Sequence, residues 1–160
     1  MEDTDKSREE TLDGFRKALQ EQFVAVFGYV VGVESTVAPF REARRKVEAC
    51  WIEVEAAFAG HPHWEDMVKD TANVRVRVGD DLFYDKGAAV EAIAEYEAAL
   101  ALDPWCTEAL KGIIAACLQG EECRAEQALP YALRLVELEP GRAADVEYIR
   151  SLIKAQTTST

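Results

Sequence analysis

Small and large apolar residues follow one another in a fixed order between Val78 and Pro104, and this order constrains the fold more than any other feature of the chain. Gly79 and Ala92 lack a bulky side chain, so two helices could approach closely at these positions. Leu82 or Phe83 would fill the space between the helices, and a second apolar face follows at Tyr96, Ala99, Leu100 and Leu102. Gly87 permits a turn, and Pro104 cannot continue a helix. The stretch therefore predicts two short antiparallel helices, at about residues 64–84 and 88–102.

A second and weaker copy of this order runs from Trp105 to Pro140 and ends in Glu139-Pro140, as the first ends in Asp103-Pro104. Its apolar positions are Leu110, Ile113, Ile114, Ala116, Cys117, Ala128, Ala132, Leu135, Val136 and Leu138. In both copies the order resembles the tetratricopeptide (TPR) repeat, whose units stack into grooved surfaces. The resemblance covers about residues 72 to 155.

The chain departs from the TPR pattern at four points. The turn near Gly87 holds one residue more than the pattern, and the turn at residues 119–124 is about two residues longer. Ile114 stands where the family has a small residue at the helix crossing, and Pro130 falls early in a helix, where it is tolerated only in the first turn. A generic helical bundle is the alternative to repeat packing.

The resemblance implies an all-α fold of TPR-like antiparallel helix hairpins, with about seven helices forming a short right-handed superhelix. We expect an N-terminal helical hairpin at residues 1–60 packed on the repeats, a TPR-like domain with a C-terminal capping helix at residues 61–155, and a loose tail at residues 156–160. The remaining helices are expected at about residues 107–118, 124–138 and 142–155. The alternation Val74-Arg75-Val76-Arg77-Val78 could form a strand, but no other segment alternates convincingly to pair with it.

The first sixty residues predict two helices that do not align with the repeat. The spacing of Ser7 and Glu10 predicts a capping box, and an apolar stripe behind them predicts a long helix that ends near Gly32 or Glu34. The stripe consists of Leu12, Phe15, Leu19, Phe23, Val26, Val30 and Val33. Ser35 or Thr36 could cap the second helix, and Gly60 would end it.

The charge balance argues against nucleic acid as a partner. The net charge is −12, from 30 acidic and 18 basic residues, and an acidic surface repels phosphates. The one basic cluster, Arg41, Arg44, Arg45 and Lys46, is interpreted as a solvated helix face. No run approaches the ~20 apolar residues that span a bilayer. The acidic N-terminus is unlike a secretory signal, so a cytoplasmic protein without membrane insertion is expected.

The sequence offers little that would support catalysis, a cofactor or a metal. Cys50, Cys106, Cys117 and Cys123 have no C-x-x-C spacing and lie in or beside apolar helical patterns, which is typical of buried, reduced thiols. His61 and His63 with nearby carboxylates could hold zinc or nickel, but a turn followed by a helix start explains the same residues. No nucleophile elbow or phosphate-binding loop is visible, so we expect no enzyme activity and no cofactor.

The TPR resemblance implies that partners bind the concave face, which is lined by the first helix of each unit. On this chain that face would present Val76, Asp80, Phe83, Tyr84, Lys111, Ala115, Leu118 and Gln119. TPR proteins that bind C-terminal carboxylates use basic and amide residues there, but here Lys111 is the only such cation and Asp80 would repel a carboxylate. An amphipathic or basic segment of another protein suits this face better.

The sequence therefore predicts a non-enzymatic adaptor or scaffold that binds a peptide or helical segment in a groove. The alternatives are a secretion-type or assembly chaperone, and a structural subunit or homodimer. A homodimer would use the stripe from Leu12 to Val33, which runs near heptad spacing.

Overall fold

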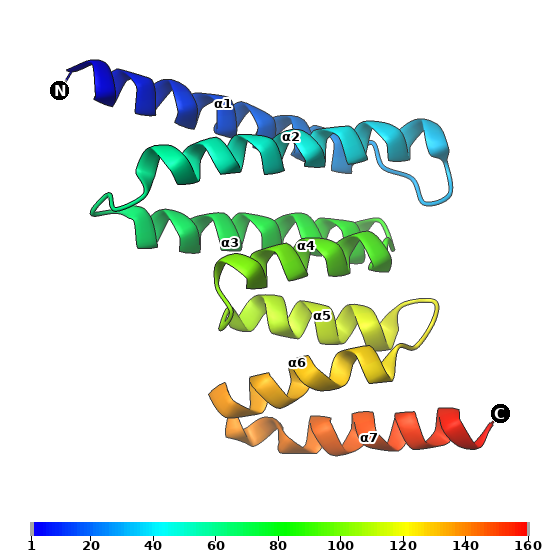
Figure 1. Cartoon of the computed structure of the whole chain (residues 1–160). Helices are drawn as coiled ribbons and strands as arrows, with labels where there is room; N and C mark the ends of the chain where they lie inside the picture. The colour runs from blue at the N-terminus through cyan, green and yellow to red at the C-terminus, as the bar shows by residue number, and fades with distance from the viewer. Residues whose placement is uncertain (1, 160) are drawn as a thin grey trace. The chain divides into compact units, whose positions relative to one another are not determined.

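The computed structural model describes residues 2–159, which form seven α-helices and contain no strand (Figure 1). The helices are α1 (Glu2–Phe27), α2 (Glu34–Phe58), α3 (Trp64–Asp80), α4 (Ala89–Leu102), α5 (Thr107–Gln119), α6 (Ala125–Leu138) and α7 (Ala143–Thr158). A π-helical turn, η1 (Asp81–Asp85), follows α3, and a 3₁₀ turn, η2 (Pro140–Arg142), precedes α7. The predicted all-α fold with about seven helices is confirmed. The chain divides into two compact units, Met1–Met67 and Val68–Thr160, so the division falls inside α3 rather than at Gly60.

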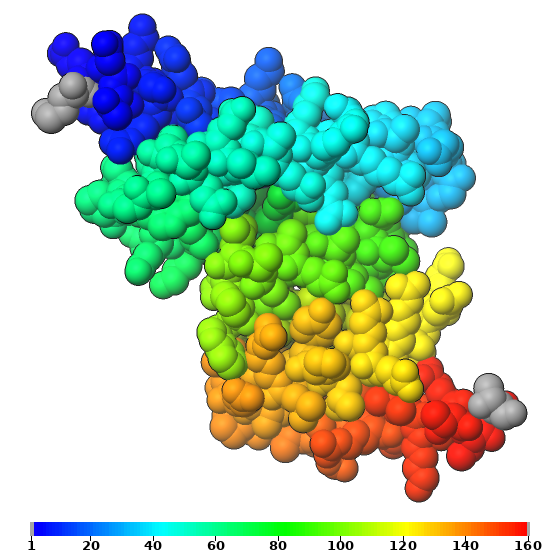
Figure 2. All heavy atoms as spheres, viewed as in Figure 1, coloured from blue at the N-terminus to red at the C-terminus, as the bar shows by residue number. Residues whose placement is uncertain are grey.

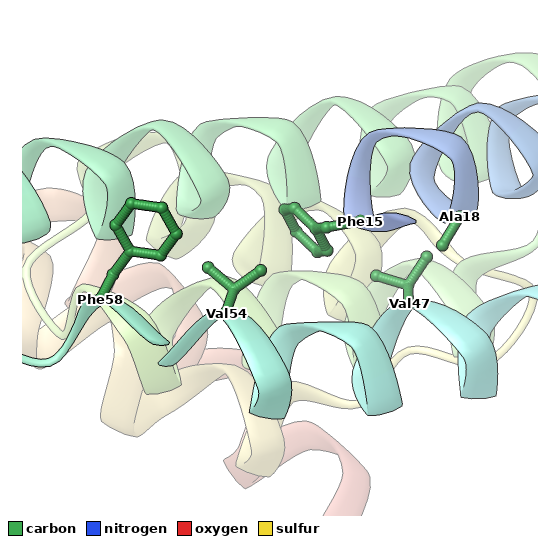
Figure 3. Close-up of a cluster of buried hydrophobic side chains, with 5 residues drawn as sticks. All are labelled: Phe15, Ala18, Val47, Val54 and Phe58. Carbon is green, nitrogen blue, oxygen red and sulfur yellow. The ribbon is translucent and has the colours of Figure 1, made fainter. Parts of the chain in front are cut away.

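The first unit is an antiparallel hairpin of α1 and α2 with its own apolar core. Figure 3 shows Phe15 and Ala18 of α1 facing Val47, Val54 and Phe58 of α2. All five side chains are buried, and burying each of the larger ones contributes about 1.5–3 kcal/mol. Aromatic rings extend this core, since Trp51 lies 5.3 Å from Phe15 and stacks on Trp64 at 5.4 Å between ring centroids.

The connection between α1 and α2 differs from the prediction. α1 ends at Phe27, before Gly32 and Glu34, and the N-cap of α2 is Val33, which makes no side-chain cap hydrogen bond. The predicted Ser35 or Thr36 cap is wrong because the Thr36 hydroxyl is used in the loop instead. It accepts a hydrogen bond from the Val30 backbone N–H at 2.9 Å and lies 2.8 Å from the Val33 carbonyl oxygen.

The second unit contains most of α3, and then α4 to α7, as successive antiparallel helices (Figure 1). In the space-filling view the atoms of this part follow in the same order, from green to red (Figure 2). Residues 74–78 are helical, so the strand alternative is wrong, and Val76 and Val78 are buried. α4, α5 and α6 begin and end within one residue of the predicted bounds. Residues 156–158 belong to α7 and are not a loose tail, while residue 160 lies outside the described residues.

The π-helical turn η1 lies where the TPR resemblance predicts one residue more than the pattern, just before Gly87. A π-helix closes i→i+5 hydrogen bonds and therefore holds more residues per turn than an α-helix. Leu82 within η1 stays fully buried, and its carbonyl oxygen accepts the Ala88 N–H at 2.8 Å. Gly87 has φ +65°, which a glycine adopts without strain, and the chain reverses there into α4.

Tyr96 of α4 explains why glycine occupies one position on α3 and another on α5. A Cβ at Gly79 would lie 2.7 Å from Tyr96 Cε1, and a Cβ at Gly112 would lie 2.5 Å from the same atom. Both distances are below van der Waals contact, so neither position accepts a side chain without movement. Gly112 therefore allows α5 to pack closely on α4, which is a contact between the hairpin α3–α4 and the next helix pair, α5–α6.

A buried ion pair joins α3 to α4. Arg75 Nη1 lies 3.0 Å from Glu95 Oε2, and the two side chains are 6% and 0% exposed. Removing two charges from water is costly, and the attraction between them offsets that cost. If one partner is lost, the other remains a buried charge without compensation, which destabilises the fold.

Among α1 to α7 no helix combines the length and the apolar character that a membrane span requires.

Candidate functional site

A groove of about 300 Å³ lies between α5, α6 and α7 in the second unit, and we call it the α5–α7 groove. Its apolar lining residues are Ile114, Ala115, Leu118, Leu135, Tyr148 and Ile149. Its polar lining residues are Lys111, Gln119, Arg142 and Asp145. An apolar surface with a few polar groups around it is the common composition of binding sites, where burial supplies affinity and polar groups fix orientation.

The three charged lining residues, Lys111, Arg142 and Asp145, belong to one ion-pair network centred on Glu139, which lies beside the groove. Lys111 Nζ lies 3.2 Å from Glu139 Oε1 and 3.6 Å from Glu108 Oε1. Arg142 Nε lies 2.5 Å from Glu139 Oε2, and its Nη1 lies 3.3 Å from Asp145 Oδ2. The hydrogen bond from Arg142, and then that from Lys111, lowers the pKa of the Glu139 carboxyl below its ordinary value. The two cations are thus already engaged by carboxylates of the chain itself.

An exposed aromatic ring belongs to the same groove. Tyr148 of α7 is 59% exposed, while its neighbour Ile149 is fully buried. Aromatic side chains that combine an apolar body with a polar tip are enriched at protein interfaces. Tyr148 therefore presents a large contact surface beside the apolar lining.

Four of the eight predicted groove residues line this groove, namely Lys111, Ala115, Leu118 and Gln119, all from α5. The other four lie on α3 and η1 and are not among its lining residues. Val76 is 6% exposed and contributes to packing rather than to an open surface. Asp80 Oδ1 accepts a hydrogen bond from the Tyr96 hydroxyl at 2.6 Å.

Phe83 and Tyr84 form an aromatic pair on η1. Their ring centroids lie 4.8 Å apart in an edge-to-face arrangement, and Tyr84 is 65% exposed. Asp81 lies on the same turn, and partial burial together with the negative charge of Asp85 raises the pKa of its carboxyl. This turn is a second exposed surface of the unit, with aromatic and acidic character.

The contribution of α7 to the groove was not predicted. The sequence placed Val146, Tyr148, Ile149 and Ile153 on a capping helix, but it assigned no groove role to Arg142, Asp145 or Tyr148. Arg142 and Asp145 are three residues apart and therefore project from one face of the helix start. This i, i+3 spacing is the sequence signal that could have indicated a charged pair at the start of the capping helix.

The two histidines belong to the turn before α3. His61 Nδ1 accepts a hydrogen bond from the His63 backbone N–H at 3.2 Å, and the His61 ring lies edge-to-face on Phe58 at 5.4 Å. Within residues 2–159 no group of three or more His, Cys, Asp or Glu side chains is placed to hold a metal ion.

The basic cluster on α2 is largely neutralised within the first unit. Arg45 pairs with Glu42, and Lys46 Nζ lies 3.2 Å from Glu21 Oε2. Arg44 Nε lies 3.5 Å from Glu48 Oε1. Arg45 and Lys46 agree with the interpretation of the cluster as a solvated helix face, whereas the Arg44 side chain is only 24% exposed.

The cysteines differ in exposure. Cys106 and Cys117 are buried and Cys50 is half-buried, whereas Cys123 is exposed, contrary to the expectation that all four are buried. Burial raises the pKa of Cys117 to about 11.

No protein-family model, no curated protein and no solved structure matches this chain. The TPR resemblance therefore stays a prediction from the residues themselves.

Proposed function

We propose that this chain is a non-enzymatic interaction adaptor that binds an amphipathic or basic segment of another protein in the α5–α7 groove. The observation that carries the proposal is the apolar lining of Ile114, Ala115, Leu118 and Leu135 next to the Glu139 network. An amphipathic helix binds such a surface by placing apolar residues spaced three or four apart into the groove.

The charge of the chain supports a basic rather than an acidic partner. Residues 79–160 contain 15 acidic and 7 basic residues, and both cations of the groove are paired with carboxylates. A cationic residue beside the apolar anchors would be attracted to Asp145 and Glu139, and complementary charge speeds association and excludes wrong partners.

The arrangement of the helices supports a TPR-like architecture for this unit. The hairpins α3–α4 and α5–α6 follow each other, and α7 packs against α6 as a terminal helix. In TPR proteins the first helices of the hairpins line the binding surface, and by order in the chain these would be α3, α5 and α7.

The proposal is tested by blocking the groove and comparing the proteins that the chain captures. Ala115→Arg places a long charged side chain in the groove, whereas Ala101→Arg makes the same change at an exposed position of α4 that does not line it. Tagged wild type and both variants are purified from the native organism, and the co-purified proteins are quantified by mass spectrometry.

We expect at least one partner to be enriched by wild type and by Ala101→Arg, and to be reduced about tenfold by Ala115→Arg, which corresponds to a loss of about 1.4 kcal/mol. The circular dichroism melting curves of the two variants establish that both are folded. A partner set that Ala115→Arg captures unchanged would remove the support for the groove as the binding site.

A further inference from the structure

The last turn of α1 and the loop that follows it carry an exposed apolar surface that the proposed function does not use. We call it the apolar tip, and it consists of Val24 (69% exposed), Phe27 (84%), Val30 (52%), Val31 (50%) and Val33 (42%). The loop lies at one end of the hairpin of the first unit (Figure 1). Single exposed apolar residues are ordinary, but a cluster of this size marks an interaction surface.

Hydrogen bonds within the loop hold the apolar tip in a defined conformation. The Thr36 hydroxyl contacts the backbone of Val30 and Val33, and the Val33 N–H donates to the Val30 carbonyl at 3.1 Å. The Tyr29 ring is buried edge-to-face against Phe40 at 5.4 Å. A surface that is ordered before binding loses less conformational entropy when it binds.

The apolar tip is also what remains of the predicted dimer surface. Leu12, Phe15 and Leu19 of the heptad-like stripe pack in the core between α1 and α2, so most of the stripe is not available to a second chain. The end of the stripe differs, because Val30 and Val33 lie beyond α1 in the loop and are exposed.

We infer that the apolar tip pairs two copies of this chain in a weak, reversible homodimer. Residues 23–33 contain no charged side chain, so two chains of net charge −12 can meet there without placing carboxylates against each other. In a two-fold contact each copy contributes the same patch, so an apolar, uncharged patch is complementary to itself. Valine side chains are stiff, so their burial costs little rotamer entropy.

The size of the apolar tip fits a weak dimer rather than an obligate one. Its exposed side chains present roughly 500 Å² on each copy, and two copies would bury roughly 1,000 Å², which is the lower limit for a specific interface. A lipid surface is a poorer occupant, because the net charge of −12 opposes adsorption to anionic headgroups.

Light scattering after size exclusion, and sedimentation equilibrium, test this inference on the full chain. We expect the apparent mass of wild type to rise from one chain toward two between about 10 μM and 1 mM, the range of a weak interface. Val31→Asp and Val24→Asp should each keep the chain monomeric over this range. Ile52→Asp, which changes a 66% exposed residue of α2 outside the tip, should dimerise as wild type does.

Three results would overturn the inference. The first is a wild type that stays monomeric at 1 mM, and the second is a dimer that both Val31→Asp and Val24→Asp leave intact. The third is a monomer that sediments with phosphatidylcholine vesicles through the tip, lost in Val31→Asp but not in Ile52→Asp. None of these results depends on the α5–α7 groove, so the inference and the proposed function fail separately.

Discussion

Neutralising Glu95 in the buried ion pair should destabilise the second unit strongly. Glu95→Gln keeps the shape of the side chain but leaves the Arg75 guanidinium, 6% exposed and 3.0 Å away, without its opposite charge. Removing one partner of a buried pair costs about 3–5 kcal/mol, because the remaining charge stays desolvated. A unit of this size has a free energy of unfolding of about 5–15 kcal/mol, so the loss is a large fraction of it.

Two comparisons isolate the burial of the charge as the cause. Glu147→Gln removes the same charge from a pair with Arg150 at 2.8 Å whose side chains are 73% and 54% exposed. An exposed pair contributes about 0–1 kcal/mol, so this variant should unfold almost as wild type does. The double variant Arg75→Met/Glu95→Leu has no buried charge and should recover most of the lost stability.

Urea unfolding followed by far-ultraviolet circular dichroism measures these differences through the transition midpoint at constant slope. The reasoning is refuted if Glu95→Gln costs no more than Glu147→Gln. It is also refuted if the double variant is as unstable as the single one, since an apolar pair leaves no charge to desolvate.

Three further predictions follow from packing and ionisation in the second unit. Gly112→Ala should lower the free energy of unfolding in urea by about 1–3 kcal/mol, because the alanine Cβ would lie 2.5 Å from the Tyr96 ring. Gly14→Ala is the control and should be neutral or stabilising, because no atom lies within 4 Å of the Cβ that it adds. Burial, and then the hydrogen bond to the Asp80 carboxylate, raises the pKa of the Tyr96 hydroxyl above its ordinary value of 10.0. The stability that the neutral Tyr96 contributes is therefore present below pH 10 and should be lost as the pH rises beyond 10, which alkaline unfolding curves of wild type and Tyr96→Phe would show. Iodoacetamide at pH 8 should label the exposed Cys123 first, whereas Cys117, which is buried and has a pKa raised to about 11, should react only at the rate of unfolding. Peptide mass spectrometry measures both rates, and equal labelling of the two cysteines would contradict the burial of Cys117.

Local pattern predicted the helices of the repeat-like region well, because their apolar periodicity agrees with the packing. Local pattern failed where one side chain has two possible hydrogen-bonding roles. Thr36 could cap α2 or bind the preceding loop, and only the position of Val30 decides between them. The end of α1 was placed too late because Val30 and Val33 continue the helical spacing although they lie beyond Phe27.

The candidate site was predicted only in part, because a groove belongs to several helices at once. The TPR resemblance indicated Lys111 and Leu118, because it assigns the binding face to the first helix of each unit. Arg142 and Tyr148 join them only through the packing of α7 against α6, which no single-helix pattern encodes.

Site-specific photocrosslinking tests the central claim about the α5–α7 groove most directly. A benzophenone amino acid is placed at Leu118, which lines the groove, or at Leu133, which is 42% exposed on α6 and does not line it. After illumination in the native organism, we expect the Leu118 probe, but not the Leu133 probe, to form a crosslink to one protein. The crosslinked segment should have apolar residues three or four apart and a neighbouring lysine or arginine. Crosslinks of equal yield from both positions, or a Leu118 adduct to an acidic segment, would contradict it.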